Sequence, residues 1–233
     1  ENPLWKDRYI YNYWRGKLSL RNQNYRLDHQ GQLFDMVNDP NQTINIGESK
    51  PEVLADLSKA KEKWLKEVLV ELPVNDNRPF YIGHPSLHTT QLPARDATAS
   101  GDIKRSNRFP NCTYFTNWID LEDTISWEAE VAQDGDFEIT VYYSCAEDAI
   151  GSLFEVSFGN ASIQGEIREA HNPSEYGASE DRVVRQESYV KDFKSLKVGK
   201  LKLKKGKGTL QIKGIKKNGI ALMDFRLMLL KRV

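Results

Sequence analysis

Beyond residue 86 the sequence consists of short stretches in which polar and apolar side chains alternate, and this pattern constrains the fold most. Residues 136–143, for example, have the sequence DFEITVYY. Alternation with a period of two is typical of a β-strand that buries one face. Because many such stretches follow one another, separated by Gly and Asn turns, residues 87–233 are predicted to form an all-β sandwich or jelly roll.

Ten strands are predicted in this region. They cover residues 87–92, 114–118, 123–131, 135–143, 152–158, 162–167, 188–198, 199–203, 208–215 and 220–230. The preceding residues 73–86 are rich in Pro, Asn and Gly and are predicted to be a linker. Within the linker, Phe80, Tyr81 and Ile82 are apolar and are expected to dock on one of the two domains that it joins.

The region before the linker has a helical pattern instead. Apolar residues recur every three or four positions over residues 51–69, which predicts an amphipathic helix, and Ser49 with Glu52 forms a candidate capping box. Aromatic side chains on both sides of residues 9–14 suggest a first strand with both faces covered. Further short strands are predicted at residues 17–22, 25–27 and 32–36. Residues 1–72 are therefore predicted to be a small α+β subdomain, an antiparallel sheet followed by one C-terminal helix.

One segment of this subdomain is distinctive. Leu33-Phe-Asp is followed by the turn Asn38-Asp-Pro-Asn and by Ile44-Asn-Ile, so a strand, an Asp-Pro turn, an Asn-apolar return and a helix occur in that order. This order resembles the C-terminal signature of the sulfatase family, in which the position of Phe34 is usually Tyr. The resemblance implies that residues 1–72 are the C-terminal subdomain of a sulfatase, whose catalytic domain precedes them in cis.

Sulfatases hydrolyse sulfate esters with a formylglycine, made from the Cys or Ser of a Cys/Ser-x-Pro-Ser/Ala-Arg motif, beside a calcium ion. The resemblance implies this activity on sulfated glycans, and a periplasmic or secreted location, for the parent protein. In this chain, Cys112 is followed by Thr-Tyr-Phe and Cys145 by Ala-Glu-Asp, so neither fits the motif. Pro85 argues against a helical metal site at His84 and His88. We therefore expect no cofactor and no activity in this chain alone.

The sandwich region has a resemblance of its own. Ala94-Arg-Asp-Ala with Gly101, the strand within residues 134–143 and the closing stretch Met223-Asp-Phe-Arg-Leu resemble galactose-binding-like modules, especially family-6-like carbohydrate-binding modules. The resemblance covers residues 87–231. It implies that the sandwich binds a sulfated or neutral polysaccharide, or that it shapes the substrate cleft of the parent sulfatase.

The same resemblance implies a structural calcium ion near Asp96 and Asp224. Arg95 stands where the family has Glu, however, and its positive charge opposes the binding of a cation. The two cysteines, Cys112 and Cys145, leave two alternatives open, a disulfide and a pair of free thiols.

Candidate sugar-binding residues are aromatic, amide and charged side chains in the predicted loops, because aromatic faces contact sugar C–H groups and polar side chains bind hydroxyls. They are Tyr114, Trp118, His171, Asn172, Tyr176, Lys217 and Asn218. Core packing is the favoured interpretation of Trp127, whereas for Trp118 core packing and sugar binding both remain open. The alternative for the whole sandwich is a purely structural or oligomerisation module that packs on the catalytic domain.

The charge is zero overall but is distributed unevenly. Residues 120–190 hold 17 acidic and 3 basic residues, whereas residues 191–233 hold 2 acidic and 14 basic ones. Because the lysines alternate with apolar residues, we expect adjacent strands to pair their acidic and basic faces, and we do not expect a nucleic-acid partner. No apolar run approaches the ~20 residues of a transmembrane helix, so no membrane span is expected.

Overall fold

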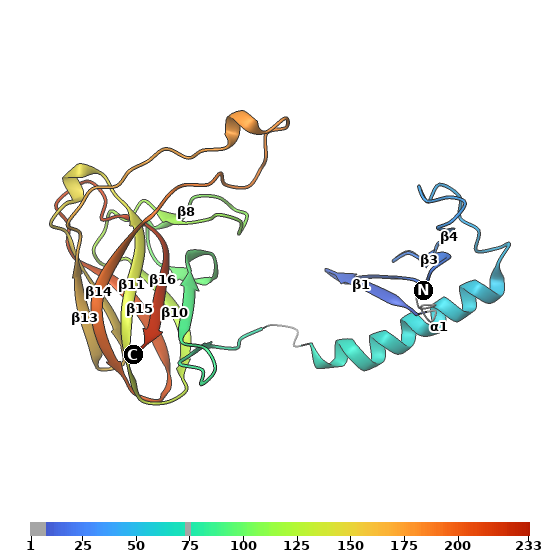
Figure 1. Cartoon of the computed structure of the whole chain (residues 1–233), viewed down its shortest axis with the longest axis horizontal. Helices are drawn as coiled ribbons and strands as arrows, with labels where there is room; N and C mark the ends of the chain where they lie inside the picture. Colours follow the sequence, from blue (N-terminus) through green and yellow to red (C-terminus); the bar gives the residue numbers. More distant parts are fainter. Residues whose placement is uncertain (1–7, 73–75) are drawn as a thin grey trace, which may run out of the picture. The chain divides into compact units, whose positions relative to one another are not determined.

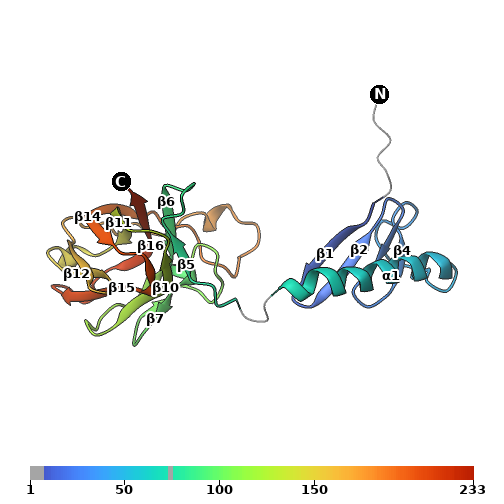
Figure 2. The ribbon, with the colours of Figure 1, turned by 90° about the horizontal axis from the view of Figure 1, so that it is seen from below.

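The computed structural model describes residues 8–72 and 76–233, and its ribbon is shown in Figures 1 and 2. The chain divides into two compact units, Glu1–Asp76 and Asn77–Val233. Each unit has its own cluster of buried apolar side chains. The parts of the predicted subdomain and linker that fall on residues 1–7 and 73–75 lie outside the described residues.

The first unit is an antiparallel sheet with one helix. Its strands pair in the order β1 (Ile10–Trp14), β2 (Lys17–Arg21), β3 (Tyr25–Leu27) and β4 (Leu33–Asp35). Helix α1 (Pro51–Val68), extended by the short 3₁₀ helix η1 (Leu69–Glu71), lies along one face of this sheet, as Figure 2 shows. Four buried leucines, Leu20, Leu27, Leu33 and Leu57, form the core between them. The predicted α+β arrangement is confirmed.

Two local expectations for this unit are wrong. The faces of β1 are not both covered, because Tyr11 stacks on Trp64 of α1 with ring centroids 5.6 Å apart while Trp14 is 66% exposed. The predicted capping box does not form either. The N-cap residue is Lys50 and makes no side-chain cap, and the hydroxyl of Ser49 donates to the carbonyl of Ile46 instead (2.9 Å).

The distinctive segment after β4 is built by three side chains that bind backbone N–H groups. The Asp35 carboxylate accepts from the N–H groups of Val37 and Asn38 at 2.9 and 3.0 Å. In the same way, Asp39 accepts from the next turn of the chain, at residues 43 and 44 (2.7 and 2.8 Å). Asn45 accepts from the N–H groups of Leu33 and Gly47. Each of these three polar residues therefore has a structural role in folding the turn.

The second unit is a sandwich of two six-stranded sheets. The first sheet has the order β13-β12-β15-β10-β5, with β7 also paired to β10, and the second has the order β14-β11-β16-β9-β8, with β6 also paired to β16. The strands are β5 (Phe80–Ile82), β6 (Thr89–Pro93), β7 (Thr98–Ala99), β8 (Lys104–Arg105), β9 (Phe115–Thr116), β10 (Thr124–Val131), β11 (Gly135–Ser144), β12 (Leu153–Phe158), β13 (Ala161–Glu166), β14 (Lys194–Leu203), β15 (Gly206–Lys216) and β16 (Asp224–Arg232). The short 3₁₀ helices are η2 (Ala94–Asp96), η3 (Glu147–Ala149) and η4 (Ala178–Glu180). The predicted β-sandwich is confirmed, and Figure 1 shows its long strands side by side.

The core between the two sheets follows from the alternation seen in the sequence. Phe137, Ile139 and Val141 of β11 are at most 1% exposed, while the residues between them are partly exposed. Trp127 of β10 is 2% exposed and packs against Phe225 of β16, so its predicted place in the core is confirmed. The two sheets are thus joined by large side chains from opposite layers.

Some strands differ from the predicted ones. Phe80–Ile82 pairs in parallel with β10, so the strands of the sandwich begin inside the predicted linker. The stretches predicted at 188–198 and 199–203 meet in one strand, β14, which begins only at Lys194 and has a register shift between Lys197 and Gly199. The φ angle of Gly199 is +141°, and a side chain there would lie 2.8 Å from the Cδ1 atom of Ile163. The glycine that suggested a turn therefore lies beside a bulge inside a strand.

Acidic residues of region 120–190 form ion pairs with basic residues of region 191–233 on or beside paired strands. Glu130 of β10 faces Lys207 of β15, with 3.7 Å between their charged groups. Lys213 binds Glu122 and Lys204 binds Asp134, each at 2.8 Å. The expected pairing of acidic and basic faces is confirmed. Within the described residues, no helix combines the length and the apolar character needed to cross a membrane.

Candidate functional site

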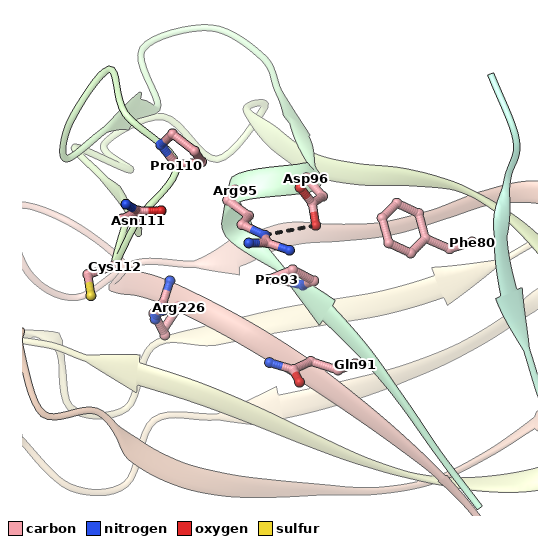
Figure 3. Close-up of a pocket in the computed structure, with 9 residues that line it drawn as sticks. All are labelled: Phe80, Gln91, Pro93, Arg95, Asp96, Pro110, Asn111, Cys112 and Arg226. Atoms are coloured by element: carbon pink, nitrogen blue, oxygen red, sulfur yellow. Dashed lines mark hydrogen bonds and ion pairs between the residues drawn. The ribbon is translucent and has the colours of Figure 1, made fainter. Parts of the chain in front are cut away.

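A pocket of about 510 Å³ lies beside strand β16, at the point where its hydrogen-bonded neighbour changes from β6 to β9 (Figure 3). Strand β6 pairs with β16 from Lys231 as far as Leu227, and β9 pairs with it at Phe225. Arg226 lies between these two pairings and has no partner in either strand. The pocket is therefore located at a break in the sheet, where the fold leaves a gap on its outer side.

The lining combines one aromatic ring with amides and charged groups. The residues are Phe80, Gln91, Pro93, Arg95, Asp96, Pro110, Asn111, Cys112 and Arg226. They come from β5, β6, η2, the loop before β9, and β16, and Figure 3 shows their side chains around a common space. A pocket of this size with a few converging polar groups is typical of a small-ligand site.

A β-bulge presents Arg226 to this pocket. Along β11, Tyr142 pairs with Leu227 and Tyr143 pairs with Phe225, so Arg226 is the extra residue of β16. Bulges are common beside functional sites because they redirect a side chain out of the regular alternation. The guanidinium is half-buried and donates a hydrogen bond from Nη1 to the carbonyl oxygen of Thr113. Burial lowers the pKa of Arg226, whereas the nearby Cys112 raises it and the positive charge of Arg95 lowers it.

The walls of the pocket are held by hydrogen bonds. Arg105 donates to the carbonyl oxygens of Ala94 and Ala97 at 3.0 and 2.9 Å, which fixes η2, and it stacks on Phe115. On the opposite wall, the buried hydroxyl of Thr113 donates to the carbonyl of Phe109. The shape of the pocket is therefore largely formed before a ligand arrives, which limits the entropy lost on binding.

Trp118 does not lie in a site. Its side chain is 1% exposed, and its backbone carbonyl accepts a hydrogen bond from the N–H of Leu222 (2.8 Å). The indole N–H is buried and, in the part of the chain that the structure describes, has no hydrogen-bond partner. The sugar-binding alternative for Trp118 is corrected accordingly, because a buried ring has no free face for a ligand.

Two other predicted residues, Tyr114 and Asn172, contact a buried lysine, Lys191. The ammonium of Lys191 lies 2.8 Å from the carboxylate of Asp224 and 3.4 Å from the amide oxygen of Asn172, and it sits over the ring of Tyr114. Tyr114 donates from its hydroxyl to Glu175 at 3.1 Å, and burial raises its pKa. His171 is tied to the sheet through two backbone hydrogen bonds with Cys145. These side chains therefore anchor the loop before β14 to the sheet.

The remaining predicted residues lie elsewhere. Tyr176 is 58% exposed, and its backbone N–H donates to the carbonyl of Val190 (2.9 Å). The amide of Asn218 donates to the carbonyl of Ile150 at 2.8 Å. Lys217 lines a second, more apolar hollow of about 750 Å³ with Ile119 and Ile220 among its other residues. The seven candidates do not form one site.

The two aspartates that the resemblance connects with calcium are already paired with cations. Asp96 accepts from Nε of Arg95 at 3.1 Å, and Asp224 binds Lys191. Among residues 8–72 and 76–233, no three His, Cys, Asp or Glu side chains cluster as a metal site would require. The residues present at Asp96 and Asp224 do not fit a calcium ion, because each carboxylate is neutralised by a neighbouring side chain.

Both cysteines are free, which resolves the alternative left open by the sequence. Cys145 is buried, and burial raises the pKa of its thiol. Cys112 is partly exposed in the wall of the pocket and has a φ of +54°, a left-handed conformation that is uncommon outside glycine.

The pocket is not predictable from the sequence because its residues do not form a pattern along the chain. Gln91 and Pro93 alternate with buried Leu92, so a place on the outer face of a strand was predictable for them. The role of Arg226 depends on a bulge, and the role of Phe80 depends on a strand that was expected to be a linker. Neither of these features has a sequence signal of its own here.

The strand pairing and the pocket define a β-sandwich module with a pre-formed pocket on the outer side of one sheet. No protein-family model and no curated protein matches the chain. Several solved structures resemble part of the chain at low similarity. A GH26-CBM35 β-(1,4)-mannanase from Podospora anserina matches 63% of this chain and 28% of its own, with 14% identity and a TM-score of 0.41.

Two further structures show the range of these similarities. The C-terminal CBM6 of LamC, a marine laminarinase from Zobellia galactanivorans, matches 61% of this chain and 98% of its own, with 11% identity and a TM-score of 0.42. The mosquito-larvicidal Cry4Aa toxin from Bacillus thuringiensis matches 62% of this chain and 23% of its own, with 12% identity and a TM-score of 0.45. The chain thus spans about a quarter of the mannanase and of the toxin. The assignment of the fold rests on the strand pairing itself.

Proposed function

We propose that the sandwich of residues 77–233 is a carbohydrate-binding module and that its site is the pocket of Figure 3. The observation that carries this proposal is the composition of the lining. Phe80 offers an apolar face to sugar C–H groups, while the amides of Gln91 and Asn111 both donate and accept hydrogen bonds, as sugar hydroxyls require. Within the described residues, neither of these side-chain amides is committed to a hydrogen bond of the protein.

The test is calorimetric titration of the protein with a panel of neutral and sulfated polysaccharides, comparing Gln91→Ala with Tyr176→Ala. Gln91 lies in the pocket, whereas Tyr176 is an exposed aromatic residue of the loop before β14. We expect saturable binding that Gln91→Ala weakens roughly tenfold, the usual effect of losing one well-placed hydrogen bond, and that Tyr176→Ala leaves unchanged. If Tyr176→Ala weakened glycan binding and Gln91→Ala did not, the binding site would lie in the loop before β14 instead.

We further propose that the parent protein is a sulfatase. The support is the segment that follows β4, in which Asp35, Asp39 and Asn45 occupy the polar positions of the family signature. In this proposal the catalytic domain, with its formylglycine and calcium, is encoded before Glu1, and the protein is periplasmic or secreted. The upstream sequence should then contain the Cys/Ser-x-Pro-Ser/Ala-Arg motif, and its absence there would refute the parentage without affecting the binding proposal.

A structural role is the second candidate, and one observation favours it. The second hollow is lined by Ile119 and Ile220, which are 37% and 81% exposed. Apolar side chains this exposed are typical of a surface that packs on another domain or copy. Under this alternative, Ile220→Asp alters the oligomeric state in sedimentation velocity or the stability of the parent protein, and no glycan binds to the pocket.

A further inference from the structure

We propose that the pocket binds an anionic group of the glycan, a sulfate ester or a carboxylate, through Arg226. This inference rests on the carbohydrate-binding function proposed above and specifies which sugars the site selects. Arg226 is a half-buried cation in a pocket wall, and within the described residues it forms no ion pair with a carboxylate.

Within the described residues, most of the N–H donors of the Arg226 guanidinium are not used in hydrogen bonds of the protein. A guanidinium has five N–H donors, and the structure gives this one a single hydrogen bond, from Nη1 to the carbonyl of Thr113. Throughout the described parts of the chain, no carboxylate forms an ion pair with Arg226. By contrast, Arg95, Arg168 and Arg185 each pair with a neighbouring acid. A half-buried cation without a partner is costly, and an incoming anion offsets this cost.

The surroundings add a second positive charge and little negative charge. Arg95 and Arg226 both line the pocket, and the one carboxylate in the lining, Asp96, already accepts from Arg95. Of the neighbours that act on the pKa of Arg226, Cys112 raises it and Arg95 lowers it. The other lining groups are uncharged amides, prolines, a phenyl ring and a thiol. The pocket therefore has a net positive charge, and the planar fork of Arg226 matches the paired oxygens of a sulfate or carboxylate.

The bulge explains why this arginine faces the ligand. Phe225 and Met228 of β16 are both buried although they are three residues apart, because the extra residue of the bulge interrupts the alternation between them. This extra residue is Arg226, which the bulge takes out of the regular alternation. Its contact with Thr113 then holds the guanidinium beside Asn111 and Cys112 in the pocket wall. A long cationic side chain fixed in this way loses little entropy when it binds an anion.

The experiment compares glycans that share a backbone and differ in charge. The probes are ι-carrageenan and its desulfated form, and chondroitin sulfate, desulfated chondroitin and carboxyl-reduced desulfated chondroitin. Titrations are performed with the wild-type protein, with Arg226→Gln, with Arg226→Lys and with the control Lys231→Gln, which removes an exposed charge from the same strand. Thermal unfolding of each variant establishes that it is folded.

We expect the charged form of at least one backbone to bind roughly tenfold more tightly than its neutral form, as for one charge-assisted hydrogen bond. Arg226→Gln should remove this preference, Arg226→Lys should retain part of it, and Lys231→Gln should retain all of it. Desulfated chondroitin distinguishes binding of a carboxylate from binding of a sulfate ester, because it keeps its carboxylates and lacks sulfate. Sodium sulfate should also compete with the glycan more strongly than sodium chloride at equal ionic strength, which tests the wild-type protein directly.

Two results would overturn the inference without refuting carbohydrate binding. Equal affinity of the charged and neutral forms would remove it while leaving carbohydrate binding in place. A charge preference that Arg226→Gln leaves intact in a folded protein would assign the anion to another site. Failure of every glycan to bind would instead refute the proposed function itself, and the inference with it.

Discussion

At the scale of single residues, the backbone of the sandwich is tightly constrained at Gly101, in the turn after β7. Its φ is +60°, and a Cβ atom there would lie 1.6 Å from Oδ1 of Asp123. The carboxylate of Asp123 is buried and accepts from the N–H of Asp102 (2.8 Å). No side chain fits without displacing this hydrogen bond.

Gly101→Ala should therefore destabilise the sandwich by about 3 kcal/mol or more, combining left-handed strain with a lost buried hydrogen bond. The matched control is Gly159→Ala, because Gly159 has a φ of +57° but no atom lies within 4 Å of the position that its Cβ would take. The control should lose only about 1–2 kcal/mol from strain. Urea unfolding of both variants measures the difference, and equal losses would contradict the role of Asp123.

The ion pair of Lys191 and Asp224 gives a second prediction. The two side chains are 8% and 22% exposed, and removal of one partner leaves a charge in a largely buried position. Lys191→Met should cost about 3 kcal/mol. The control is Lys204→Met, which removes an ion pair with Asp134 in which both side chains are exposed. Here the free energy of unfolding should change by less than about 1 kcal/mol. Similar losses in the two variants, measured in denaturant, would argue against this explanation.

At the scale of elements, the turns after β4 depend on ionised carboxylates. Hydrogen bonds from the backbone and side chain of Asn38 lower the pKa of Asp35, and the backbone N–H of Ile44 is the main cause of the lowered pKa of Asp39. A carboxyl group whose pKa is lower in the folded state stabilises the fold at all pH values above its unfolded pKa, about 3.9. This stabilisation is lost as the pH falls through the lower, folded value.

The first unit should therefore lose protection in acid. Amide hydrogen exchange at Leu57, corrected for the intrinsic pH dependence, should show falling protection below about pH 4, and Asp39→Asn should reduce this dependence. Because the carboxylates of Asp35 and Asp39 are exposed, we expect a shift in the pH at which protection at Leu57 falls. Protection that increases toward acid pH would contradict the expected sign.

The elements also show what sequence patterns can predict. The α1 helix and the long strands β10, β11 and β15 follow directly from their periodicity, because burial of one face selects the apolar positions. The two- and three-residue strands β5, β7 and β8 lack enough length for a period, and they form through pairing with other strands. The short strand β5 and the bulge at Arg226 both contribute to the pocket, which is why the site escaped prediction while the fold did not.

At the scale of the whole molecule, the two cores share no residue. The core of the sandwich runs from Ile82 to Leu230, and that of the first unit from Leu20 to Leu57. A fragment of residues 77–233 should therefore fold by itself, with its strands and its pocket, and should bind glycan as the full chain does. Circular dichroism and titration of this fragment test the prediction. An unfolded fragment would show that the sandwich needs the first unit.

The central claim is that the pocket of Figure 3 binds a glycan. Hydrogen–deuterium exchange of the full chain, with and without the polysaccharide that binds most tightly, tests this claim most directly. We expect slower exchange in peptides that contain residues 89–96, 109–113 and 224–228, with little change elsewhere. Protection confined to residues 170–182, or to the hollow around Ile119 and Ile220, would contradict it.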